Sequence, residues 1–224
     1  MHVRRPGRFY SSLRVVFRSV LAMTMRWRVA GLENEPSEGG YLLAICHLSH
    51  LDPVIVSSAM RRRISWVSRV EFYRHRLMRG FLYYNGAFPV NRSGYARPAL
   101  REALARLAAG EVVGIFPEGE IMSGAHSVLR AGRVRHGVCW LAARSGRPVL
   151  PVVMLGTDRL GTIGPWLPAR RGRLWLTAGQ PLTAPRGAYS KTGRAAFAAT
   201  LEGEFRRLFQ ETRQRDGLEE SIVP

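Results

Sequence analysis

The sequence predicts an α/β fold: a single domain with a central mixed, mostly parallel sheet flanked by helices, preceded by an N-terminal amphipathic helix. Three observations indicate this class. Short apolar runs of strand length alternate with longer segments of helical periodicity. The 224 residues suffice for one sizeable hydrophobic core. Polar residues follow several of the apolar runs, as they do in open parallel sheets that bind ligands.

The first unit, residues 1–30, is basic and amphipathic. Seven arginines precede the first acidic residue, Glu33. Apolar residues recur at spacings of four and three, which predicts a helix with one apolar stripe: Phe9, Leu13, Val16, Val20, Met23 and Trp27. The stripe fits either the headgroup region of a membrane or the core of the domain, and both hold if the arginines face lipid. Arginines interrupt every window of about 20 residues, so we expect no transmembrane span, and no signal peptide.

The second unit, residues 31–214, should hold the folded domain, and residues 215–224 a C-terminal tail. Periodicity and breakers predict strands at 41–46, 64–67, 112–116, 149–154 and 174–178. Helices are expected at 53–60, in short pieces between 70 and 84, and at 97–108, 136–144 and 194–213. The helix at 97–108 should have Leu100, Leu104 and Leu107 on one face. The closing helix at 194–213 should place four residues inward: Phe197, Leu201, Phe205 and Leu208.

His47 and Asp52 are the first candidates for catalysis. They follow the predicted strand 41–46, and a carboxylate on one imidazole nitrogen would fix the tautomer and stabilise the imidazolium. Asp52 before Pro53 also reads as a helix N-cap, and a carboxylate with two oxygens can do both. The spacing alone is weak support in a chain with six histidines and three aspartates. The interpretation therefore depends on segments further along the chain.

Three such segments follow in order. Residues 86–92 end in Arg92, whose planar guanidinium suits a phosphate. Residues 111–119 form a hydrophobic strand that stops at a proline and delivers Glu118 at its carboxyl end. Residues 148–154 form a buried type of strand punctuated by prolines. Polar residues at these strand ends predict one ligand-binding edge of the sheet.

Together the four segments resemble the motifs of the glycerolipid acyltransferase family, which includes the 1-acylglycerol-3-phosphate acyltransferases. His47 to Asp52 matches the family's His-x4-Asp motif, and residues 86–92 match its arginine-containing second motif. Residues 116–119 match its Phe-Pro-Glu-Gly motif, and residues 148–152 its proline-bearing fourth motif. The lead-in 31–36 is similar as well. The resemblance spans about residues 27–182, and four ordered motifs arise by chance far less readily than one.

The resemblance implies an O-acyltransferase of phospholipid biosynthesis. A fatty acyl group would pass from a thioester, acyl-CoA or acyl carrier protein, to the hydroxyl of a lysolipid, without a covalent acyl-enzyme, metal or other cofactor. The acceptor implied first is of the lysophosphatidate type; a lyso-aminolipid or another lysophospholipid is the alternative. The implied roles are general base for His47, its orientation by Asp52, and acceptor binding by Arg92, Glu118, Gly119 and Arg135. Backbone N–H groups would stabilise the oxyanion.

Two departures from the family pattern bear on these roles. Cys46 stands where the family commonly has asparagine, and no arginine follows the Glu118-Gly119 pair within residues 120–123. Arg135, before Gly137, matches a basic step that the family often shows, and Arg130 or Arg133 offers a further phosphate ligand.

Each cysteine is expected to be buried, unpaired and inert. A Cys46 nucleophile with His47 as its base is disfavoured because adjacent side chains on a strand diverge. His47, His50 and Asp52 could converge on a cation, but the chain lacks a zinc-binding motif.

The formal net charge of +18 predicts partners with negative charge. An anionic membrane surface is the partner we expect, with the enzyme in the cytoplasm and peripheral on the inner face of the membrane. The alternative from another class is a non-catalytic basic protein that binds membranes or nucleic acid. Nucleic acid is not expected, because aromatic residues are not interleaved with the arginines as a base-stacking surface requires.

Overall fold

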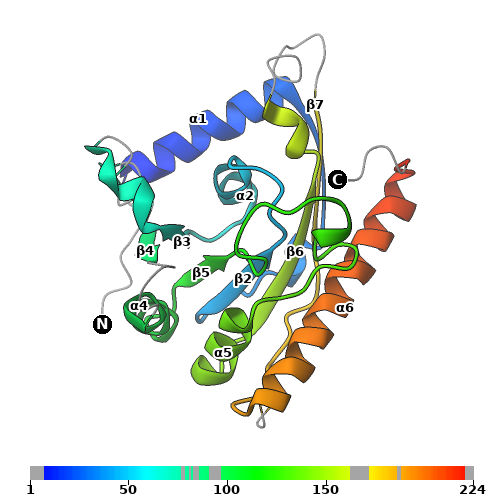
Figure 1. The fold of residues 1–224 in the computed structure, drawn as a ribbon. Coiled ribbons are helices and arrows are strands. Elements are labelled where there is room, and N and C mark those ends of the chain that lie inside the picture. The colour runs from blue at the N-terminus through cyan, green and yellow to red at the C-terminus, as the bar shows by residue number, and fades with distance from the viewer. Residues whose placement is uncertain are drawn as a thin grey trace.

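The computed structural model describes residues 8–76, 79–80, 82, 86–90, 97–161, 172–185 and 188–219, without the side chains of residues 8–14 and 17. Its centre is a seven-stranded sheet in the order β1-β7-β6-β2-β5-β3-β4 (Figure 1). The strands are β1 Met25–Ala30, β2 Tyr41–Ile45, β3 Ile64–Arg69, β4 Phe88–Val90, β5 Val112–Ile115, β6 Val149–Leu155 and β7 Gly172–Ala178.

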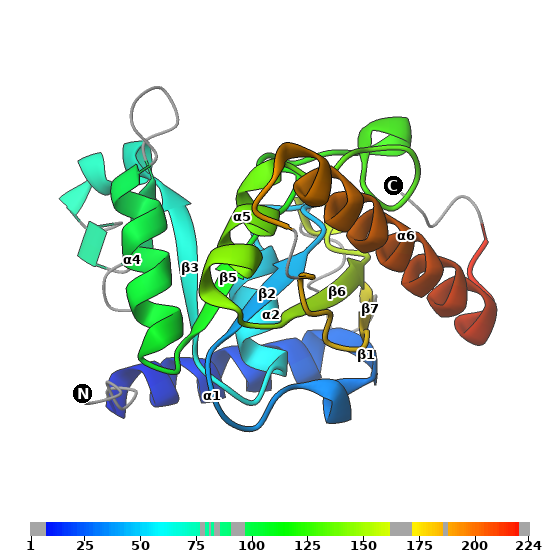
Figure 2. The same cartoon turned by 90° about the horizontal axis from the view of Figure 1, so that it is seen from below.

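Helices lie on both faces of this sheet. They are α1 Arg8–Thr24, α2 Asp52–Ala59, α4 Arg97–Ala108, α5 His136–Ser145 and α6 Lys191–Asp216, with 3-10 turns η1 Leu32–Asn34, η2 Val70–Arg74, η3 Gly124–His126 and η4 Asp158–Gly161. Helices α4, α5 and α6 cover one face, and α1 and α2 the other, as Figure 2 shows from below. The predicted α/β class is confirmed.

Strand direction explains where a site can form. Strands β6, β2, β5, β3 and β4 are mutually parallel, whereas β7 runs antiparallel to β6 and carries β1 parallel to itself at the sheet edge. The predicted mixed, mostly parallel sheet is therefore confirmed. The carboxyl ends of five strands meet along one edge, so the loops that follow β2, β5 and β6 lie close together.

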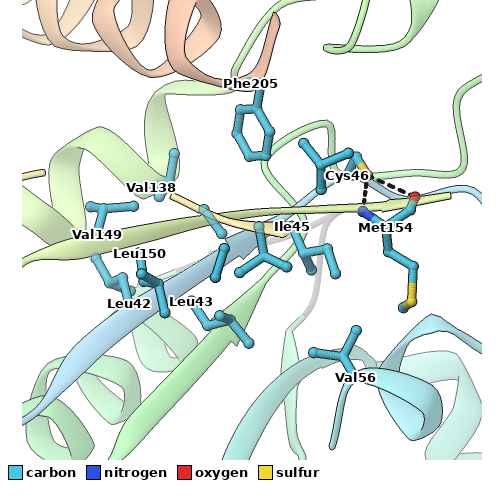
Figure 3. Packing of buried hydrophobic residues seen from close by; sticks show 14 of the residues in the cluster. Leu42, Leu43, Ile45, Cys46, Val56, Val138, Val149, Leu150, Met154 and Phe205 are labelled. Carbon is cyan, nitrogen blue, oxygen red and sulfur yellow. Dashed lines mark hydrogen bonds between the residues drawn. The ribbon is translucent and has the colours of Figure 1, made fainter. Parts of the chain in front are cut away.

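The core is densest around β2 and β6, in which every residue is buried. Figure 3 shows Phe205 of α6 and Val138 of α5 on one side of these strands and Val56 of α2 on the other. Burial on both faces accounts for the unbroken apolar runs that the sequence shows at these positions. The four predicted inward residues of α6 are buried, which confirms its orientation, and α6 extends three residues further at each end than predicted.

One sequence prediction is wrong in detail. The N-terminal helix ends at Thr24, and Trp27 lies in β1, where it pairs with Leu174 of β7; the helical spacing had extended the stripe into an edge strand.

In α4, the leucines expected on one helical face all pack on the core. Leu107 is buried, and Leu100 and Leu104 are partly buried against the core cluster. Ala99 and Ala103 are buried as well.

A buried carboxylate holds the entrance to β2. The side chain of Glu35 accepts hydrogen bonds from the Tyr41 hydroxyl at 2.8 Å and from the backbone N–H groups of Arg61 and Arg62 at 2.8 and 3.0 Å. Burial, followed by the charge of Glu35, raises the pKa of Tyr41 well above its ordinary value, so the hydroxyl stays a donor. Glu35 thus joins the start of β2 to the chain leaving α2.

We predict that Glu35→Ala lowers the free energy of unfolding by about 3 kcal/mol, because one buried and two part-buried donors lose their acceptor. Urea denaturation followed by far-UV circular dichroism measures the change. Glu38→Ala, an exposed glutamate in the same segment, is the matched control and should change stability little. Equal midpoints for the two variants would contradict the role assigned to Glu35.

Candidate active site

The structure brings His47 and Asp52 into contact at the carboxyl end of β2. His47 follows the strand by two residues, Asp52 is the first residue of α2, and His47 Nδ1 lies 3.0 Å from Asp52 Oδ2. An ionised carboxylate only accepts hydrogen bonds, so it selects the imidazole tautomer with its proton on Nδ1. Asp52 is fully buried, and the His47 side chain keeps 14% of its surface exposed. Nε2 is therefore the nitrogen that can act as a base toward a substrate.

The predicted N-cap role of Asp52 is wrong. Leu51 occupies the cap position, and within the part of the chain that the structure describes, no side chain caps α2 by a hydrogen bond. The Asp52 carboxylate instead points back along the chain, where Oδ2 accepts the backbone N–H groups of Leu48 at 2.8 Å and Ser49 at 2.9 Å. These donors and the positive end of α2 stabilise the ionised carboxylate that faces His47.

Glu118 is buried directly behind His47. Its Oε2 accepts the backbone N–H of His47 at 2.7 Å, and its Oε1 accepts the N–H of Val128 at 2.7 Å and the hydroxyl of Ser127 at 3.0 Å. Burial raises the pKa of Glu118 above its ordinary value, while these three hydrogen bonds oppose the rise. The carboxylate therefore fixes the backbone that carries the imidazole. Direct contact of Glu118 with an acceptor stays a prediction.

Gly119 and Arg135 lie against each other beside Glu118. Gly119 has a φ of +82°, and a Cβ there would come within 2.7 Å of Arg135 Nε. Arg135 donates from Nε to the Glu118 carbonyl at 2.6 Å and from Nη2 to Glu120 Oε1 at 2.7 Å. The guanidinium thus braces the turn and still exposes 60% of its side chain.

A hollow of about 310 Å³ opens next to this turn. Two of its lining residues are bonded to the His47 backbone: Glu118 through its carboxylate, and Met122, whose N–H donates to the His47 carbonyl at 3.0 Å. The full lining is Glu118, Met122, Ala125, His126, Ala131, Gly132, Arg133 and Arg135. Two arginines and a histidine make the hollow suitable for an anionic group.

The predicted phosphate ligand Arg92 lies outside the described residues. The segment that leads to it is described as far as Val90, the last residue of β4. Arg106 of α4 holds this segment: its Nη1 donates to the Gly86 carbonyl at 2.9 Å, and its guanidinium lies 4.8 Å from the centre of the Phe88 ring. The carboxyl end of β4 thereby faces the same sheet edge as His47.

Sequence reasoning missed the groups that support the dyad from behind. Ser127 and the Val128 N–H belong to an irregular turn with no motif to mark them. The His47 ring also stacks on Phe116, with centroids 3.8 Å apart and planes at 20°, and Phe116 stacks on Trp66 at 5.1 Å and 14°. One signal was available: Gly114 interrupts a strand, and such a glycine marks a close approach.

Cys46 is buried beside the dyad and belongs to the core. Its sulfur lies 3.4 Å from both the N and the O of Met154, which ties the end of β2 to β6 (Figure 3). Burial raises the pKa of the Cys46 thiol well above its ordinary value, and it raises the pKa of Cys139 to about 11. The prediction that both cysteines are buried and unpaired is confirmed.

His50 lies on the surface, with its ring 6.5 Å from that of His47. Across the described ranges, no three side chains of histidine, cysteine, aspartate or glutamate gather closely enough to hold a metal ion. A buried aspartate that orients an imidazole at the carboxyl edge of a parallel sheet defines a class of enzymes that activate a hydroxyl or a water.

Comparison with known proteins places the chain within that class. The sequence model of the Acyltransferase family matches residues 26–155, more than half of the chain, and the chain belongs to this family. It is similar to the 1-acyl-sn-glycerol-3-phosphate acyltransferase of Bacillus subtilis strain 168, with 25% identity over 192 residues, 84% of this chain and 91% of that protein.

The fold is also found in a solved structure. The crystal structure of PlsC, the 1-acyl-sn-glycerophosphate (LPA) acyltransferase of Thermotoga maritima, superposes with a TM-score of 0.64 at 20% identity. The likeness covers 93% of this chain and 84% of that one, so most of both chains shares the fold.

We predict that Cys46→Ala retains acyl transfer within about threefold of the wild type, because the thiol makes only weak hydrogen bonds to Met154. Release of thiol from an acyl-thioester donor measures the rate. Native protein should also resist iodoacetamide at both cysteines, and unfolded protein should react fully. Loss of nearly all activity in correctly folded Cys46→Ala would point to a covalent thiol mechanism instead.

Proposed function

We propose that this protein transfers a fatty acyl group from a thioester, acyl-CoA or acyl carrier protein, to the hydroxyl of a lysolipid in phospholipid biosynthesis. The observation that carries the proposal is the His47–Asp52 pair, in which the aspartate is buried, His47 Nδ1 contacts it, and the His47 side chain stays partly exposed. The activities of the two relatives, both 1-acylglycerol-3-phosphate acyltransferases, support 1-acylglycerol-3-phosphate as the first acceptor to test.

The proposed reaction is a direct transfer. His47 Nε2 accepts the proton of the acceptor hydroxyl as its oxygen attacks the thioester carbonyl, and Asp52 stabilises the imidazolium that forms. The new C–O bond replaces the C–S bond, and the leaving thiolate takes the proton back from His47. Glu118 keeps the His47 backbone in place throughout, and no side chain is acylated.

The headgroup of the acceptor is the finer part of the proposal. We assign the hollow beside Glu118 to this headgroup because Arg133, Arg135 and His126 line it, which favours a phosphate. Arg92 is proposed as a further phosphate ligand. One observation favours a lyso-aminolipid as the second candidate. Glu120 pairs with Arg135, a residue that lines the hollow, and so places a negative charge beside it.

Proton transfer is tested with purified protein by thiol release across a panel of lysolipids. His47→Ala and Asp52→Asn should each lower kcat by at least about 100-fold, because the base or its orientation is lost. His50→Ala is the matched control and should stay near wild type, since His50 is an exposed neighbour. Equal rates for wild type and His47→Ala would refute the mechanism, and the preferred headgroup in the panel decides between the two acceptors.

We further propose that the enzyme acts from the cytoplasm on the anionic inner surface of the membrane. The outer stripe of α1 is exposed, at 57% for Val16, 41% for Val20 and 65% for Met23, whereas Leu21 attaches the helix to the core at 1%. An apolar stripe on a basic protein suits a helix lying in the headgroup region. Within the described ranges, no helix combines the length and the hydropathy that crossing a bilayer requires.

Vesicle pelleting tests this surface. Val20→Asp combined with Met23→Asp should lower binding to vesicles of phosphatidylglycerol and phosphatidylcholine by at least about tenfold, because both residues lose apolar contact and add negative charge. Tyr189→Asp is the control: Tyr189 is 57% exposed and precedes α6, whose first turn lies far from α1 (Figure 1). Unchanged binding of the double variant, or a preference for duplex DNA over vesicles at the same salt, would contradict the proposal.

A further inference from the structure

Three aromatic rings form a continuous stack at the carboxyl edge of the sheet. The stack consists of His47 after β2, Phe116 after β5 and Trp66 in β3, and we call these three rings the ring column. The three strands are neighbours in the order β2-β5-β3, so the column runs across the sheet. The His47 and Phe116 planes differ by only 20° at 3.8 Å, which puts the imidazole face to face with a phenyl ring.

Two residues outside the column shape its far end. Trp66 pairs with Gly114 in the sheet, and a Cβ on Gly114 would come within 2.6 Å of the Trp66 ring, so only glycine leaves the space. The indole N–H of Trp66 donates to Ser57 Oγ at 2.9 Å. Ser57 belongs to α2, the helix that begins with Asp52. Trp66, at the end of the ring column away from His47, is thereby fixed to α2, the helix that carries Asp52.

We propose that the ring column positions the His47 imidazole and stabilises the positive charge that His47 acquires during acyl transfer. The face of an aromatic ring attracts a cation, and the imidazolium forms directly against the Phe116 face. The stack also fixes the plane of the imidazole, and so the direction of Nε2, in a way that the single contact with Asp52 does not. Phe116 and Trp66 are positioning residues, with Trp66 acting through Phe116.

The inference rests on the proposed function of His47 as the base, and it differs from plain packing in what it predicts. A packing role lowers stability when a ring is removed and leaves the chemical step of the folded enzyme unchanged. A positioning role lowers kcat with KM nearly constant, because the imidazolium exists only after substrate has bound. It also places His47 protons in the shielding region of the Phe116 ring.

Phe116→Leu and Trp66→Leu test the proposal, with Phe197→Leu as matched control. Phe197 is buried like Trp66, whereas Phe116 is partly buried, and Phe197 lies on α6, away from the dyad. Phe116→Leu should lower kcat by about three- to tenfold with KM values within about twofold. Trp66→Leu should have a smaller effect of the same kind, whereas Trp66→Phe, which keeps a ring, should restore most of kcat. Thermal unfolding of every variant identifies those that remain folded at the assay temperature.

A spectroscopic readout needs no activity. In protein labelled with ¹³C-histidine, the His47 ring proton signals, assigned through His47→Gln, should be shifted upfield and should move toward free histidine in Phe116→Leu. Loss of that shift with unchanged kcat, or an equal loss of kcat in Phe197→Leu, would overturn the positioning role. Equal activity of wild type and His47→Ala would instead refute the proposed function itself, so the two failures are distinguishable.

Discussion

The hydrogen bond between the Glu118 carboxylate and the His47 backbone N–H is the interaction on which the arrangement of the site depends. It joins the loop after β2 to the loop after β5, two segments that share a sheet edge and are separated by about 70 residues of chain. A backbone N–H just beyond the end of a strand has no hydrogen-bond acceptor in the sheet. Leaving such a donor unsatisfied away from water is costly. Glu118 satisfies it, and the same carboxylate orders the turn at Ser127 and Val128.

The site therefore contains two buried carboxylates in different environments. Asp52 accepts two backbone N–H groups at the start of a helix, where its charge is well stabilised. Burial raises the pKa of Glu118, and three donors from the site's own backbone and from Ser127 oppose that rise. The first carboxylate orients the imidazole ring, and the second orients the chain that bears it. The imidazole ring and the backbone of His47 are thus both held in place before any substrate binds.

Much of this architecture could be predicted from the sequence because periodicity and burial act locally. The unbroken apolar runs around residues 41–46 and 149–154 predicted the two central strands. The spacing of His47 and Asp52, together with the three later motifs, predicted their contact. The edge strand β1 was missed because its pairing with β7 is a tertiary contact across most of the chain.

The supporting groups of the site were missed for the same reason. The bond of Ser127 to Glu118 and the stacking of Trp66 on Phe116 link residues that no sequence pattern relates. Gly114 is the exception. A glycine inside a strand indicates that another side chain approaches closely, and here that side chain is Trp66.

The position of α1 shows how the proposed membrane association would relate to the chemistry. Helix α1 packs against α2, and α2 begins with Asp52, so one helix separates the exposed apolar stripe from the dyad (Figure 1). With α1 lying in the headgroup region, a lysolipid could present its hydroxyl to His47 while its acyl chain stays among the lipids. Exposing that chain to water would cost about 0.8 kcal/mol for each CH₂ group, which makes extraction of a long-chain acceptor slow and rare. In the proposed arrangement, with the base one helix above the bilayer, the enzyme avoids that cost.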